Sequence, residues 1–231
     1  VEKNIDNAIS FLQVQDGVLQ SSGKILDRMA ELKALSQDVL KNSSDIANYN
    51  AEFKNLQVQL FQMSATTFNG VSLFANHISS NSSTEALFGG TEAADNTVSI
   101  FTSATGESGS KVSINKAMLL SALTINASDA DLASVKYSDK ATASNFSFAA
   151  SVSGDAIALG DISVAVFTQA LQNIATLRAE NGGSVSRLQF SKESATLQKT
   201  NLEAANGRIM DVDIATESTQ LAKYNILVQA S

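Results

Sequence analysis

The sequence predicts a mainly α-helical fold with a small β part. We expect an elongated bundle of long antiparallel helices, an N-terminal helix pair plus a C-terminal helix, with a β-hairpin and a variable β-containing insertion. Three observations lead to this prediction. The 231 residues include no proline, the residue that breaks helices. Apolar residues recur every seven positions near both ends of the chain. From His77 to about residue 155, Ser, Thr, Asn and Gly become frequent and the helical periodicity disappears.

The first predicted helix spans about residues 4–41. It carries two adjacent rows of apolar residues at seven-residue spacing, as a coiled-coil-like seam requires. One row is Phe11, Val18, Ile25, Leu32 and Val39, and the other is Leu12, Leu19, Leu26 and Leu40, interrupted only by Lys33. The polar residues 42–45 (Asn-Ser-Ser-Asp) then break the pattern and supply N-cap residues for a second helix.

The second predicted helix starts near residue 46. Its apolar residues alternate spacings of three and four: Ile46, Tyr49, Phe53, Leu56, Leu60 and Met63. A helix of about 28 residues would be roughly 42 Å long. We expect it to end near Asn69-Gly70, because this dipeptide favours a turn.

The central region contains one clear β signal. Val98 and Ile100 alternate with polar residues, and so do Val112 and Ile114 after a Gly-containing turn, which predicts a β-hairpin. Phe146, Phe148, Ala150 and Val152 alternate similarly. Residues 116–140 fit a short helix and a short strand equally well.

Helical periodicity returns at Ile162 and continues to the last residues. Three rows follow one another: Val164, Phe167, Leu171 and Ile174; then Leu188, Ala195, Leu202 and Ile209; then Ile214, Leu221 and Val228. The last row is offset from the second, so the seam shifts near Gly207, and Gly182-Gly183 is a place where the rod could loosen or kink. The N-terminal and C-terminal helices most simply bury their stripes against each other.

Composition excludes several function classes. A net charge of −7 with few, scattered Lys and Arg residues argues against a nucleic-acid binder. No apolar run approaches the roughly 18 residues that span a bilayer, so we predict no membrane insertion. The absence of cysteine rules out disulfides and thiolate metal sites.

The residues also offer no catalytic constellation. His77 is the only histidine, and the interpretation as an exposed loop residue outweighs that as a general base. Asp211 and Asp213 are two apart on a helix and point to different sides, so they cannot share a metal ion. We therefore predict no enzyme, no cofactor and no metal site. Asp213 and Glu217 repel each other at i,i+4, which suggests a cationic neighbour on another element or another chain.

Several segments resemble bacterial flagellins. The C-terminal segment NLEAANGRIMDVDIATESTQLAKYNILVQAS carries their pattern at Asn201, Leu202, Ala205, Arg208, Ile209, Asp211, Asp213, Ala215, Glu217, Leu221, Ile226, Leu227, Gln229 and Ala230. The preceding stretch TLRAENGGSVSRLQF is similar at Arg178, Asn181, Gly182, Arg187 and Leu188. TTFNGVSLF resembles the flagellin turn Phe68-Asn69-Gly70, and TVSIFTSATGESGSKVSI resembles the hairpin after it. Residues 119–159 match no family.

The resemblance implies a structural subunit of the bacterial flagellar filament, which self-assembles into a helical tube for motility. A hook–filament junction protein and a secreted coiled-coil adhesin or translocator are the alternatives. Residues 1–77 and 160–231 would form the helical rod, and residues 78–118 a loop and hairpin of the same core domain. Residues 119–159 would be a variable insertion, either part of the core or a small outer elaboration. We also expect a flagellin that lacks the terminal inner-tube segments and is monomeric in dilute solution.

The same resemblance implies partners and locations. The partners are other flagellin subunits in a homopolymer, the hook-associated junction and cap proteins, and the flagellar export apparatus with its chaperone. The protein would be extracellular, exported by the flagellar type III pathway. The expected assembly residues are Phe68, Asn69, Gly70, Arg178, Asn181, Arg187, Arg208, Asp211, Asp213 and Glu217.

A receptor surface is the last expectation. Flagellins seen by the vertebrate Toll-like receptor for flagellin carry a Leu-x-Arg-x-x-Glu-Leu pattern, which Leu26, Arg28, Glu31 and Leu32 match. Glu52 falls where the family places a receptor-contacting carboxylate. Asp27 and Ala30 depart from the usual Gln and Arg. Arg28, Glu31, Leu32 and Glu52 are therefore candidate contacts, although Leu32 also fits a core position.

Overall fold

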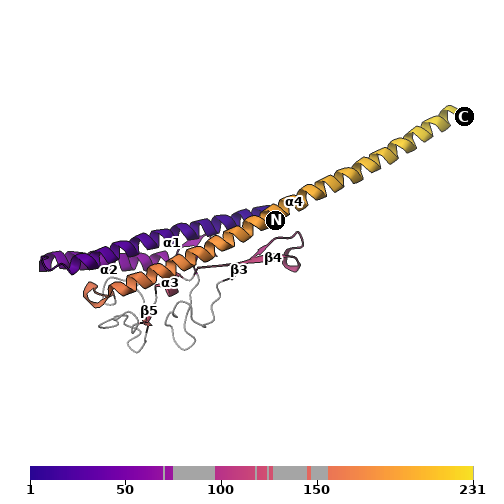
Figure 1. Ribbon diagram of the computed structural model, residues 1–231. Helices are drawn as coiled ribbons and strands as arrows, with labels where there is room; N and C mark the ends of the chain where they lie inside the picture. Colours follow the sequence, from indigo (N-terminus) through magenta and orange to yellow (C-terminus); the bar gives the residue numbers. More distant parts are fainter. Residues whose placement is uncertain are drawn as a thin grey trace.

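The computed structural model describes most of the chain and shows an elongated helical rod. The described residues are 1–69, 71–74, 97–117, 119–123, 125–126, 145–146 and 156–230. Gly70, His77, Phe148 and most of the predicted insertion lie outside them. Three long helices run side by side, α1 (Glu2–Ser36), α2 (Ser43–Met63) and α4 (Val164–Ala230), and α4 continues alone beyond the N-terminus (Figure 1). The predicted fold class is confirmed.

Small hairpins and short helices lie beside the rod. The strands pair antiparallel as β1 (Thr67–Phe68) with β2 (Val71–Ser72), β3 (Thr97–Phe101) with β4 (Lys111–Asn115), and β5 (Ile125–Asn126) with β6 (Asn145–Phe146). The short helices are η1 (Gly106–Ser108), α3 (Leu119–Ala122) and η3 (Leu159–Asp161). In β3 and β4, Val98 lies opposite Ile114 and Ile100 opposite Val112, so the predicted hairpin is confirmed.

The seam between α1 and α4 forms the core. Leu12, Leu19 and Leu26 of α1 are fully buried, as one predicted heptad row requires. On α4 the buried residues are Val166, Phe167, Ala170, Asn173, Ile174, Leu177, Asn181, Ser184 and Leu188. Helix α2 joins the seam through Phe53, whose ring stands edge-on to Phe167 with centroids 6.0 Å apart. Helix α4 is continuous through both predicted weak points, Gly182 and Gly183.

Helix α1 ends at Ser36, five residues before the predicted end at about residue 41. The rows extend to Val39 and Leu40, but α1 stops at Ser36, and these two side chains are 94% and 89% exposed. A local hydrogen bond explains the difference, because Asp38 Oδ1 accepts the Leu40 N–H at 2.9 Å. Such a side-chain bond to the backbone competes with helix formation.

Helix α2 is capped within the predicted segment 42–45, begins at Ser43 instead of near residue 46, and ends early. Asn42 is its N-cap, and its Oδ1 accepts the Asp45 N–H at 2.9 Å. The helix has 21 residues instead of about 28, because the chain leaves the helix after Met63. There Thr66 Oγ1 donates to the Met63 carbonyl at 2.7 Å and satisfies one of the last free carbonyls.

Buried polar side chains fasten the segment before α4 to the rod. Gln57, fully buried on α2, donates its Nε2 to the Ile157 carbonyl at 2.6 Å and accepts the Ile157 N–H at 3.0 Å. Asn50 Oδ1 accepts the Leu159 N–H at 2.8 Å, and Lys33 Nζ donates to the Leu159 carbonyl at 3.0 Å. These four bonds hold the backbone of Ile157 and Leu159 against α1 and α2.

The Gln57→Leu variant tests this attachment. Leucine keeps the size of the side chain but leaves the Ile157 N–H and carbonyl buried without these partners, and each such group costs about 1–3 kcal/mol. We expect the free energy of unfolding, measured in urea, to fall by about 2–3 kcal/mol. Gln62→Leu, on the exposed side of the same helix, should leave it nearly unchanged. Equal effects of the two substitutions would contradict this assignment.

Candidate assembly and recognition surfaces

An exposed ion-pair network joins α1 to α2. Arg28 Nε donates to Glu52 Oε1 at 2.8 Å and its Nη2 donates to Glu52 Oε2 at 3.1 Å, so the pair is bidentate. Arg28 Nη1 also lies 3.0 Å from Glu31 Oε1. Hydrogen bonding from Arg28 lowers the pKa of Glu52, and the two carboxylates raise the pKa of Arg28. The structure thus brings three of the four candidate receptor residues together at the surface.

Leu32 does not belong to this surface. Its side chain is fully buried, as is Leu26 of the same sequence pattern. The prediction of Leu32 as a contact residue is therefore wrong for its side chain, because the heptad row turns it into the seam. The alternative assignment to the core is the one that holds.

A ladder of polar pairs runs along the outside of the α1–α4 seam. Arg178 Nε donates to Asp16 Oδ1 at 3.0 Å, which raises the pKa of Arg178. Further along, Lys192 Nζ donates to Asp6 Oδ1 at 2.7 Å. Glu2 accepts from Thr196 Oγ1 at 2.9 Å and lies 3.8 Å from Lys199 Nζ. In each ion pair the acid is on α1 and the base on α4. Of these residues, the sequence prediction had singled out Arg178 alone.

Inside the seam, Asn181 makes a helix-to-helix hydrogen bond. Its buried Nδ2 donates to the Leu12 carbonyl at 2.8 Å. Among the described residues, Asn181 Oδ1 and both terminal atoms of buried Gln15 have no hydrogen-bond partner. Asn181 therefore joins α4 to α1 inside the subunit and helps to fix their alignment. It does not lie at the surface. Arg187, the next motif residue, is exposed.

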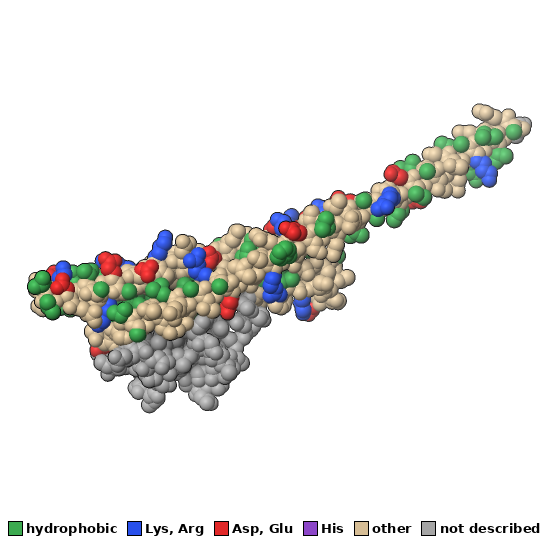
Figure 2. Space-filling model, in the orientation of Figure 1, with side chains coloured by type: hydrophobic (Ala, Val, Ile, Leu, Met, Phe, Trp, Pro, Cys, Tyr) green, Lys and Arg blue, Asp and Glu red, His purple; other side chains and the backbone are tan. Residues whose placement is uncertain are grey.

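The distal half of α4 exposes apolar side chains. Leu202, Ile209, Ile214, Leu221 and Val228 are each 62–73% exposed, and Figure 2 shows hydrophobic groups along this part of the helix. The predicted assembly residues Arg208, Asp211, Asp213 and Glu217 are also exposed here. In the described part of the chain, no ion pair joins Asp213 or Glu217 to a cation.

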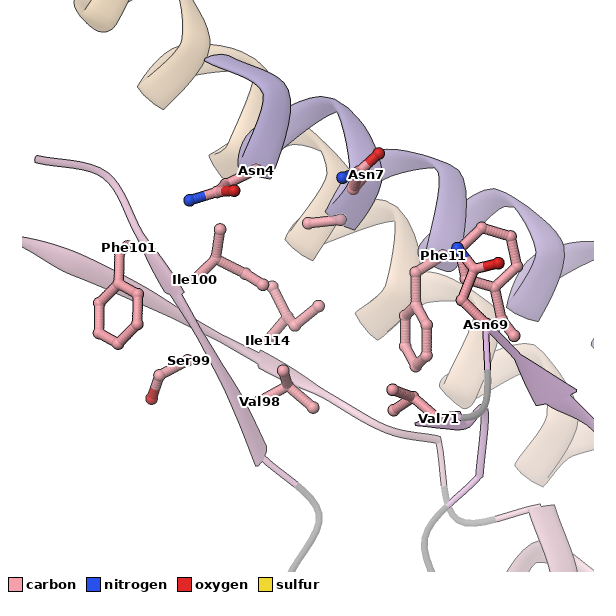
Figure 3. A pocket seen from close by; sticks show the side chains of 12 residues that line it. Asn4, Asn7, Phe11, Asn69, Val71, Val98, Ser99, Ile100, Phe101 and Ile114 are labelled. Carbon is pink, nitrogen blue, oxygen red and sulfur yellow. The ribbon is translucent and has the colours of Figure 1, made fainter. Parts of the chain in front are cut away.

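The Asn69 turn lies beside an apolar depression, which we call the hairpin hollow. Asn69 has φ of 50°, a left-handed value that Asn tolerates, and the ring of Phe68 stands edge-on to Phe11 at 6.2 Å. The hollow measures about 350 Å³ between α1 and the two hairpins (Figure 3). Its apolar walls are formed by Phe11, Phe68, Val71, Val98, Ile100 and Ile114.

None of the described helices has the length and hydropathy of a membrane span. No group of three or more His, Cys, Asp or Glu side chains gathers as metal ligands within the described ranges.

Both ends of the chain match models of one protein family. Residues 1–79 match the model of the bacterial flagellin N-terminal helical region, and residues 164–231 match that of the C-terminal helical region. The flagellin of Listeria innocua serovar 6a is 26% identical over 99% of this chain and 71% of its own length. The Bacillus subtilis flagellin is 27% identical over 99% and 73%.

Solved structures share the fold. The Bacillus cereus flagellin crystal structure has a TM-score of 0.53 at 20% identity, covering 89% of this chain and 95% of that one. A putative flagellar hook-associated protein from Vibrio parahaemolyticus has a TM-score of 0.56 at 16% identity, covering 89% and 88%.

The pKa of Glu52 tests the exposed network. In an Arg28→Gln variant we expect the pKa of Glu52, followed by NMR, to rise towards its ordinary value of 4.5. Because the pKa of Glu52 is lowered in the folded state, its ionised form stabilises the fold above pH 4.5 and this contribution is lost as the pH falls through the folded value. Replacing Arg178 by Gln should leave Glu52 unaffected. A pKa near 4.5 in the unmodified protein would refute the pairing.

Proposed function

Because the chain belongs to the bacterial flagellin family and is a structural subunit of the flagellar filament, we propose that the distal half of α4 is its principal assembly surface. The binding partners at this surface are other flagellin subunits, since the family polymerises into filaments. The single observation that carries this proposal is the exposure of apolar side chains along α4 beyond the rod, with Ile209 and Leu221 each 63% exposed.

The apolar row provides the free energy of this contact. Each large aliphatic side chain that becomes fully buried contributes about 1.5–3 kcal/mol. Soluble monomers seldom expose so long a line of such residues, and those that do use it for binding. Leu202 and Ile209 also continue the spacing of buried Leu188, so the partner would pack against α4 as α1 does.

Charged residues would orient the partner. Asp213 and Glu217 repel each other on adjacent turns of α4, and a Lys or Arg of the neighbouring subunit would relieve that repulsion. We assign Asp211 and Arg208 to the same contact. A head-to-tail contact of this kind, whose rotation does not close a ring, adds subunits as an open filament.

The wider setting follows the family. The flagellar filament lies outside the cell, and we propose that this chain reaches it through the flagellar type III export apparatus with a chaperone and meets hook-associated junction and cap proteins there. Residues 1–77 and 160–231 are assigned to the rod, residues 78–118 to the same core domain and residues 119–159 to the variable insertion. Flagellins are structural proteins, and the role proposed here involves no catalysis, nucleic acid or membrane insertion.

The alternatives have less support. A junction protein shares the fold, as the hook-associated neighbour illustrates, but the family models and the curated relatives that match this chain are flagellins and flagellar filament core proteins. An adhesin or translocator would share only the helical periodicity.

An Ile209→Asp variant tests the assembly surface. We expect unchanged thermal unfolding of the isolated chain, because Ile209 is 63% exposed, and at least a tenfold loss of filaments by electron microscopy. The matched control is Ser218→Asp, which adds the same charge nine residues away, half a turn around the helix. Normal filaments from the Ile209 variant would contradict the proposal.

A second role concerns recognition by the vertebrate Toll-like receptor for flagellin. Arg28, Glu31 and Glu52 are held by one another in a fixed, exposed arrangement, which limits the entropy lost when a partner binds. We propose these three residues, without Leu32, as the receptor contact. The family's pattern and this local geometry both support the proposal.

Receptor signalling in cultured cells tests this role. Arg28→Gln should weaken the response at least tenfold, since it removes one contact and releases Glu52. The control variant Arg178→Gln removes a comparable surface pair, that of Arg178 with Asp16. Asp16 lies twelve residues before Arg28 on α1, about 18 Å away, so this variant should signal normally. A response to the Arg28 variant equal to that of the unmodified chain would remove the assignment.

A further inference from the structure

The dipeptide Asn-Gly occurs three times in this chain, and the structure places the three asparagines in two different settings. Asn181 and Asn206 lie inside α4, whereas Asn69 lies between the strands β1 and β2 and lines the hairpin hollow (Figure 3). One molecule therefore holds the same pair of residues in a helix and in a turn.

Asn-Gly is a chemically labile pair, because its two residues can react with each other. The backbone nitrogen of the glycine, after losing its proton to hydroxide, bonds to Cγ of the asparagine, and the side-chain amide nitrogen leaves as ammonia. Water then opens the resulting succinimide ring at either carbonyl, which gives aspartate or isoaspartate. One water molecule is consumed and one ammonia is released, without an oxidant, a reductant or a cofactor.

Helix α4 opposes this reaction at Asn181 and Asn206. The glycine that follows each of them donates its N–H to the helical hydrogen-bond ladder, so its nitrogen is not free to lose the proton and attack. Ring closure also rotates the asparagine backbone away from helical dihedral angles, which would break α4 in its interior. Asn181 is held further, because its Nδ2 donates to the Leu12 carbonyl at 2.8 Å. Asn206 is exposed, so the helix is its main protection.

The turn at Asn69 offers much less resistance. Strands β1 and β2 are two residues long and pair only Thr67 with Ser72 and Phe68 with Val71. A two-stranded hairpin is marginally stable at best on its own, so this one opens locally at a small cost in free energy. The Asn69 side chain is also exposed to the water that opens the succinimide ring.

From these observations we propose that Asn69 is a site of spontaneous deamidation in the folded chain. It loses its amide group at least tenfold faster than Asn181 and Asn206 lose theirs. The reaction needs no second protein and no assembled filament, so it goes beyond the proposed function and does not depend on it.

Deamidation changes the wall of the hairpin hollow. Either product carries a carboxylate, which is ionised at neutral pH, next to the apolar residues Phe68 and Val71. Isoaspartate also inserts the Cβ methylene of residue 69 into the main chain. The longer connection disturbs the pairing of Phe68 with Val71, and with it the contact between the rings of Phe68 and Phe11 at 6.2 Å.

Peptide mapping by mass spectrometry tests the proposal on the full chain. The folded protein is kept in mildly alkaline buffer, and each conversion is read from the replacement of a side-chain NH₂ group by OH, a gain of about one dalton. We expect Asn69 to react at least tenfold faster than Asn206, which is the matched control because it has the same dipeptide and is also exposed. In guanidinium chloride, which removes the helix, the three asparagines should react at similar rates.

An Asn69→Gln variant provides the second measurement. Glutamine would have to form a larger ring, so the fast phase of ammonia release from the folded chain should disappear. Similar rates at Asn69 and Asn206 in the folded, unmodified chain would overturn the proposal. Ammonia release from the variant as fast as from the unmodified chain would overturn it as well. The peptide mapping needs no substitution, so its result stands whether or not the variant folds.

Discussion

The antiparallel contact between α1 and the first half of α4 is the interaction on which the rest of the structure depends. It buries Leu12, Leu19 and Leu26 against the α4 row that ends at Leu188. Helix α1 has 35 residues and α4 has 67, so the contact covers only part of α4. The same apolar spacing that folds the rod continues along the distal half of α4, so in the proposed assembly both processes use one kind of surface.

Polar groups give this seam a single register. Heptad rows of similar aliphatic residues would fit nearly as well after a shift of seven residues. The Asn181 bond to the Leu12 carbonyl and the Asp16–Arg178 and Asp6–Lys192 pairs all break in a shifted alignment. An exposed ion pair contributes little stability, so we attribute to these pairs the choice of alignment more than its strength.

Apolar periodicity predicted the long helices, the hairpin and the packing of the two chain ends, because burial sets those features. It failed where a local polar group decides, as at Asp38, which ends α1 although the heptad row continues to Leu40. It also could not find Gln57, whose partner Ile157 is 100 residues away and leaves no periodic trace. The receptor pattern gave Arg28 and Glu31, and the family resemblance gave Glu52, but a linear motif cannot tell which way Leu32 faces.

The attachment of the chain on both sides of the central region explains how the rod accommodates it. Before that region, Phe74 is buried and bridges to Ala117, and after it Ile157 is held by Gln57. Both bridges use backbone groups, which every residue type provides. The points at which the described chain leaves and rejoins the rod are therefore held by the backbone bridge at Ala117 and by the Gln57 side chain.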